Sequence, residues 1–123
     1  RLADGRIAMV LNPVNAAMSP DRRVSLYDEI EGRGEAAPEG TGGAVWGVAR
    51  APMSLVFSAD HGLTFSSPRN LETGSGYCLT NNSKEGRNRE YSYPSILEAP
   101  DGALHIAYTY HRRAIKYVHI HSR

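Results

Sequence analysis

Several arginines in this chain could bind an anionic group. Arg50 precedes an apolar segment, Arg89 precedes a tyrosine-rich segment, and Arg112 and Arg113 stand together between two strand-like segments. A guanidinium is planar and gives a carboxylate two parallel hydrogen bonds, which a lysine ammonium cannot match. Residue type alone favours ordinary surface arginines, because exposed ion pairs contribute little and turn residues are usually solvated.

A tyrosine and a glutamate in the same region could take part in covalent catalysis. Tyr93 carries a phenol, whose ordinary pKa of about 10 means that it needs a base before it can act as a nucleophile. Glu90 is close in sequence, but a three-residue offset puts it on the opposite face of a regular strand. Glu90 is therefore a candidate base only if the chain bends there. The alternative is that Tyr93, like Tyr91, packs against a sheet.

Other reactive side chains carry weaker signals. His105 and His119 lie on strand-like segments without a second ligand at a useful spacing, so no metal site is expected. Cys78 has no histidine pattern near it and is expected to be a buried thiol. Asn81 begins an Asn-Asn-Ser sequon, a signal that depends on the compartment. No cofactor is expected.

Short strands must position these side chains. Strand-like composition marks residues 6–11, 53–57, 95–98, 103–108 and 115–120, and the last of these alternates with a period of two. Residues 24–30 are the best helical segment, and about 13–49 form a long loop or insertion rich in glycine. The composition of this loop favours a disordered insertion. The alternative is a loop that folds over the mouth of a site, with Trp46 as its one large aromatic side chain.

Asp-Gly pairs introduce two of the strands. Asp4-Gly5 precedes the first strand and Asp101-Gly102 precedes the fourth, an arrangement typical of hairpins. Aligned on these pairs, the two segments look like internal repeats. The chain has 12 glycines and 7 prolines among short strands, which indicates many turns and an all-β fold class.

Residues 58–65 read Ser-Ala-Asp-His-Gly-Leu-Thr-Phe, and five of these positions have separate physical tasks in a tight turn. Ser58 and Asp60 carry oxygens that accept hydrogen bonds from nearby backbone N–H groups, and Gly62 permits a positive φ. Thr64 and Phe65 are expected to restart a strand. A carboxylate with this task is structural, so Asp60 is not expected to be catalytic.

This spacing is identified as an Asp-box and resembles the repeat of sialidases and related β-propellers, where it caps the hairpin between the outer strands of a blade. Residues 11–13, 50–55 and 90–95 also stand in the order found there. The resemblance covers most of residues 2–120 apart from the long insertion. It implies a partial β-propeller, about two blades of a six-bladed ring, in one domain fragment over residues 1–123.

By this resemblance Arg50 falls at the third arginine of the triad that holds the substrate carboxylate, and Tyr93 falls at the tyrosine nucleophile. A neutral nucleophile avoids repulsion from that carboxylate, on the order of 4 kcal/mol at 4 Å and an effective dielectric constant of 20. Tyrosine nucleophiles are a recognised exception among glycosidases. Further candidates are Asn12, Arg89 and Arg112 for substrate binding and Glu90 for catalysis. The family's other two arginines, its acid/base aspartate and its glutamate base lie upstream of the matched region.

The balance of charge excludes some classes of function. The chain has 14 basic and 13 acidic residues and a formal net charge of +1, which indicates neither a nucleic-acid nor a membrane partner. One cysteine excludes an internal disulfide, and no apolar run approaches the roughly 18 residues of a membrane span. The sequence opens at Arg1 without a methionine, so a targeting region can be missing and the localisation stays open.

The resemblance implies a sialidase-like exo-glycosidase that hydrolyses a terminal sialic acid or related acidic sugar with retention. This chain supplies part of the site and is expected to be inactive alone. The alternative is a non-catalytic propeller that binds glycans or proteins, because a fold alone does not fix function. Open strand edges predict pairing with the remaining blades or self-association. The expected small partner is a glycan with a carboxylate.

Overall fold

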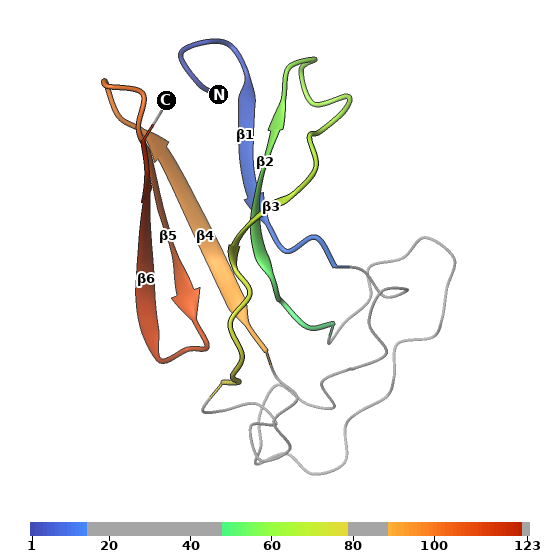
Figure 1. Cartoon of the computed structure of the whole chain (residues 1–123), viewed down its shortest axis with the longest axis vertical. Helices are drawn as coiled ribbons and strands as arrows, with labels where there is room; N and C mark the ends of the chain where they lie inside the picture. Colours follow the sequence, from blue (N-terminus) through green and yellow to red (C-terminus); the bar gives the residue numbers. More distant parts are fainter. Residues whose placement is uncertain (15–47, 79–88, 122–123) are drawn as a thin grey trace.

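The computed structural model describes residues 1–14, 48–78 and 89–121, which form two antiparallel three-stranded sheets and no helix (Figure 1). β1 (Ile7–Leu11), β2 (Met53–Ser58) and β3 (Arg69–Glu72) make the first sheet in that order. β4 (Tyr91–Glu98), β5 (Leu104–Tyr110) and β6 (Ala114–Ile120) make the second. The predicted all-β class is confirmed.

Three of the sequence predictions lie outside the described residues. They are the helix at 24–30, most of the loop at 13–49 and the sequon that begins at Asn81. In the ranges that the structure describes, no helix is long and apolar enough to cross a membrane.

The hydrophobic core lies between the two sheets. Because side chains alternate along a strand, each sheet turns one apolar face toward the other. The buried residues of this core are Ala51, Met53, Leu55, Tyr91, Leu104, Ile106 and Tyr108. β1 and β4 are in contact across the two sheets, as Figure 1 shows. The core thus joins the first half of the described chain to the second.

The same three hydrogen bonds close both Asp-Gly turns. In the first turn, Leu2 N donates to Arg6 O at 2.8 Å, Gly5 N donates to Leu2 O at 3.0 Å, and Arg6 N donates to Asp4 Oδ1 at 2.9 Å. In the second turn these bonds measure 2.8, 2.9 and 3.0 Å and join the equivalent residues Ala99, Asp101, Gly102 and Ala103. Both glycines have positive φ, 90° and 81°. β1 and β5, which follow the turns, are therefore equivalent strands.

Strand pairing extends this equivalence to β2 and β6. Ile7 pairs with Ser58, and its equivalent Leu104 pairs with Ile120. The matched residues differ in burial. Three residues of β2 pack in or against the core, namely Met53, Leu55 and Phe57. Their counterparts on β6 are exposed, namely Ile115, Tyr117 and His119. The second sheet therefore exposes the face that the first sheet buries.

The turn between β2 and β3 has the predicted side-chain bonds. Ser58 Oγ accepts the N–H of Gly62 at 2.8 Å, and Gly62 has a φ of 93°. Asp60 accepts the hydroxyl of Thr64 at 2.5 Å and the N–H of Thr64 at 2.9 Å. These two bonds from Thr64, together with one from Ser58, lower the pKa of Asp60 from 3.8 to about 2. Both carboxylate oxygens of Asp60 thus accept hydrogen bonds within the turn, as expected for a structural carboxylate.

The prediction that Thr64 and Phe65 restart a strand is wrong, because β3 begins only at Arg69. The N–H of Thr64 is already bonded to Asp60, so it cannot join a strand ladder. Pro68 has no N–H to donate and also delays the strand. Ser66 N instead donates to Phe57 O at 2.8 Å, which closes a wider turn.

Candidate functional site

A buried carboxylate lies at the end of the molecule where β4 starts and β5 ends. The side chain of Glu90 has no exposed surface. Its Oε1 accepts hydrogen bonds from Ser92 Oγ at 2.9 Å and from Arg112 Nε at 3.1 Å. Arg50 Nη1 lies 3.8 Å from the same oxygen. Glu90 therefore brings Arg50 and Arg112, two of the predicted substrate-binding residues, to one point.

The two arginines keep Glu90 ionised. Burial raises the pKa of Glu90, but the hydrogen bonds from Arg112 and Ser92 and the charges of Arg112 and Arg50 outweigh it, so the pKa lies below its ordinary value. Both arginine side chains remain partly exposed, 40% for Arg50 and 33% for Arg112. The site thus holds a buried negative charge beneath two accessible positive charges.

Backbone bonds fix Arg50 beside Glu90. Arg50 N donates to Arg89 O at 3.0 Å, and Tyr91 N donates to Arg50 O at 2.8 Å, which makes a parallel bridge between Arg50 and Glu90. Arg50 lies just before β2 and Glu90 just before β4, so the bridge connects the two sheets at this end. The position of Arg50 is therefore set by both sheets.

Asn12 supports this bridge from the end of β1. Its Nδ2 donates to three backbone carbonyls, those of Arg50 at 3.0 Å, Pro52 at 2.9 Å and Tyr91 at 3.1 Å. The amide group of Asn12 is thus bonded to the backbone on both sides of the site. Its predicted role as a substrate contact stays a prediction, while its observed contacts hold the backbone.

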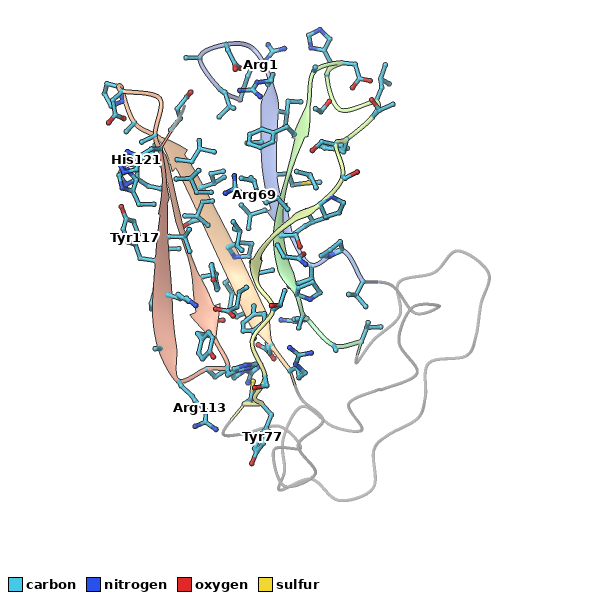
Figure 2. All side chains as sticks on the ribbon, in the orientation of Figure 1. Arg1, Arg69, Tyr77, Arg113, Tyr117 and His121 are labelled. Carbon is cyan, nitrogen blue, oxygen red and sulfur yellow. The ribbon has the colours of Figure 1, made fainter. Side chains whose placement is uncertain are left out.

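Arg112 reaches the site from the three-residue connection, residues 111–113, between β5 and β6. Arg113 N donates to Tyr110 O at 2.9 Å and closes the turn. The two central residues have positive φ, 49° for His111 and 55° for Arg112. Turns of this kind usually take Asn-Gly, because other residues are strained at positive φ. The turn directs Arg112 toward Glu90 and leaves Arg113 exposed, where its Nη2 donates to Tyr77 O at 3.3 Å (Figure 2).

Tyr93 sits in an irregular part of β4. The pairing of β4 with β5 shifts between Ser92 and Ser95, and Tyr93 has a φ of 52° and a residue exposure of 72%. The chain therefore bends between Glu90 and Tyr93, so the regular alternation that would separate them does not apply. Positive φ in a residue other than glycine stores strain, which is frequent at functional sites.

Arg112 also lies within electrostatic reach of Tyr93 and Cys78. Burial lowers the pKa of Arg112, but the hydrogen bond and charge of Glu90 outweigh it, with smaller contributions from Cys78 and Tyr93, and the pKa is raised. Cys78 is a buried free thiol, as predicted.

The side chain of Arg89 bonds the segment after β3 and not Glu90. Its Nη2 donates to the carbonyls of Thr73 and Gly74, at 3.0 and 2.5 Å, and Tyr91 Oη donates to the same Gly74 carbonyl at 2.7 Å. These contacts connect the segment after β3 to the start of β4. The structure does not bring Arg89 into the cluster around Glu90.

Sequence reasoning missed two members of the cluster. Ser92 bonds both the Glu90 carboxylate and Thr109 Oγ1, at 2.9 and 2.7 Å. His111 bonds the backbone of Glu90 and is itself 1% exposed. The signal for His111 was available: a His-Arg pair between two strands occupies a turn that normally requires Asn-Gly.

The cluster is suited to bind an anion. Arg112 uses Nε toward Glu90, and a guanidinium has four further N–H donors. Arg50 adds a second guanidinium, and Tyr93 adds an exposed phenol. Among the described residues, no group of three or more His, Cys, Asp or Glu could hold a metal ion.

The fold and the repeated turns define an all-β repeat protein. A family model described as a BNR repeat-like domain matches residues 1–106, and the chain belongs to this family. This confirms the predicted membership of the superfamily that includes sialidases. No curated protein and no solved structure matches the chain.

Proposed function

We propose that this chain forms part of a sialidase-like exo-glycosidase that removes a terminal sialic acid or a related acidic sugar. The observation that carries the proposal is the cluster in which buried Glu90 holds Arg50 and Arg112, three residues before the strained, exposed Tyr93 on the same bent strand. Glu90 orients the two guanidinium groups. Their accessible N–H groups bind the substrate carboxylate, for which bidentate geometry is well matched.

Tyr93 is the proposed nucleophile, by its resemblance to the sialidase tyrosine. A base takes the phenol proton as the phenol oxygen bonds to the anomeric carbon, while the bond to the leaving oxygen breaks and an acid protonates that oxygen. Water then cleaves the glycosyl-tyrosine bond on the same face, which gives retention. The role of Glu90 as the base stays a prediction, because its described contacts are with arginine and serine.

The proposed architecture is a partial β-propeller. Two equivalent sheets packed face to face, with equivalent turns, are what neighbouring blades require. The exposed face of β6 and the unpaired strand edges would then contact further blades, from the same protein or from another copy. The glycan and these blades are the proposed partners.

The test is hydrolysis of a fluorogenic sialoside by the full-length protein and by its Tyr93→Phe variant. We expect the variant to lose at least roughly 100-fold in kcat, because the nucleophile is absent. Tyr117→Phe, on the exposed face of β6, is the matched control and should retain activity. The anomer released first, followed by proton NMR, should show retention.

Two outcomes would count against the proposal. Undiminished turnover by Tyr93→Phe would remove Tyr93 from the mechanism. A wild-type protein that binds sialic acid without turnover would favour the alternative, a non-catalytic glycan-binding propeller.

A further inference from the structure

His111 bonds both main-chain polar groups of Glu90. His111 N donates to Glu90 O at 2.9 Å, and Glu90 N donates to His111 Nδ1 at 3.3 Å. Glu90 is buried, so its N–H and C=O must find partners inside the protein. The bridge to Arg50 uses the backbone of Arg89 and Tyr91 instead. His111 is thus the residue that satisfies the Glu90 backbone.

The contact with Glu90 fixes the proton on His111. Because Glu90 N–H is a donor, Nδ1 must present its lone pair, which puts the imidazole proton on Nε2. Burial and the charges of Arg89 and Arg113 lower the pKa of His111, which favours the neutral ring. The ring also packs against Tyr91 and Tyr110, with both centroid distances 4.7 Å. Its Nε2 is buried and has no hydrogen-bond partner among the described residues, so the bond at Nδ1 and the ring contacts hold the imidazole.

The turn that carries His111 is strained, and both of its central residues contact Glu90. His111 and Arg112 have φ values of 49° and 55°, where residues other than glycine are strained. His111 bonds the main chain of Glu90, and Arg112 bonds its carboxylate. Strained residues persist only where surrounding contacts hold them in place. Here the contacts of both strained residues are with Glu90.

We propose that His111 is a positioning residue: by holding the backbone of Glu90, it sets the orientation of the carboxylate and so of Arg50 and Arg112. The expected effect of His111 on sialoside binding rests on the proposed function. Its effect on the geometry of Glu90 does not. Without the imidazole, the Glu90 N–H loses its bond to Nδ1, and the carboxylate that anchors the two guanidinium groups is held less firmly.

The first measurement uses the unaltered protein. We expect NMR to detect a coupling through the hydrogen bond between the Glu90 amide nitrogen and His111 Nδ1, and an imidazole protonated at Nε2. An imidazole protonated at Nδ1 would overturn the proposal without any variant.

The second measurement compares two variants that both tolerate positive φ. His111→Asn keeps an acceptor oxygen near the position of Nδ1, whereas His111→Gly removes it and relieves the strain. We expect His111→Gly to shift the Arg112 Nε and Glu90 carboxyl NMR signals and His111→Asn to restore them. Unchanged signals in a folded His111→Gly variant would overturn the proposal.

The kinetic measurement separates this inference from the proposed function. In an active protein, His111→Gly should raise KM for a sialoside roughly ten-fold with a smaller change in kcat, because carboxylate binding is weakened. His111→Asn should recover most of this loss. A wild-type protein without turnover would contradict the proposed function, while the NMR signals would still decide the role of His111.

Discussion

At the scale of single residues, the neighbours of Glu90 stabilise its buried carboxylate, which would otherwise destabilise the folded protein. A buried carboxylate is unfavourable unless charges and donors compensate it. Arg112 supplies both a hydrogen bond and a charge, and Arg50 supplies a more distant charge. The neighbouring Arg113 occupies the same turn but is exposed and contacts only a carbonyl among the described residues. Two adjacent arginines therefore differ in energetic importance.

We expect Arg112→Gln to lower the free energy of unfolding at neutral pH by about 1–3 kcal/mol, because it leaves Glu90 poorly compensated. Arg113→Gln should change it by less than about 0.5 kcal/mol. Urea denaturation measures both. Because the pKa of Glu90 lies below 4.5 in the folded protein with Arg112 present, Glu90 contributes to the free energy of unfolding above pH 4.5. This contribution is lost as the pH falls through the folded-state pKa. The difference between the wild type and Arg112→Gln should therefore shrink below that pH, and equal losses in the two variants would contradict this account.

At the scale of elements, the turn between β2 and β3 is organised by one carboxylate. Asp60 accepts three side-chain or backbone bonds from Ser58 and Thr64, and these bonds require the ionised form. The turn is otherwise exposed, and Leu63 at its tip is mostly solvated. Its order therefore depends on hydrogen bonds more than on packing.

We expect the Thr64 amide signal to titrate with a midpoint of about 2, well below the ordinary 3.8 of an aspartate. Because the pKa is lowered in the folded state, the turn's stabilisation is complete above 3.8 and is lost as pH falls toward 2. Proton NMR follows the titration. Asp60→Asn should abolish it, and a midpoint near 3.8 in the wild type would show that the bonds are weak.

Strands and turns were predictable from the sequence because their signals are local. Asp-Gly pairs and period-two alternation predicted the segments that became β1, β5 and β6. The bend at Tyr93 was not predictable, since it depends on how β4 pairs with β5. The same holds for the three carbonyls bonded by Asn12, which come from distant segments. The resemblance selected Arg50 and Tyr93, whereas residue type selected Arg112 and closeness in sequence to Tyr93 selected Glu90. Only the fold showed that Arg50, Arg112 and Glu90 meet.

At the scale of the whole molecule, one core stabilises both sheets. Leu55 of the first sheet and Ile106 of the second are almost fully buried in it. A single sheet cannot cover its own apolar face and needs a second layer, so each sheet depends on the other. The site around Glu90 spans both sheets and requires them to be folded together.

We expect Leu55→Ala to cost about 2–5 kcal/mol, because it leaves a cavity between the sheets. Leu97→Ala, at an exposed leucine of β4, should cost far less. Methyl NMR during urea titration should show both sheets unfolding in one transition. Loss of the first sheet at a lower urea concentration than the second would show that the sheets are independent.

The equivalence of β2 and β6 gives the pair of sheets a direction. Each sheet has a front, carried by Met53, Leu55 and Phe57 in one copy and by Ile115, Tyr117 and His119 in the other, and a back of different composition. In the pair, the front of the first meets the back of the second. A third sheet that packed in the same way would place its back against the exposed front of the second sheet. Such a stack would therefore grow in one direction only.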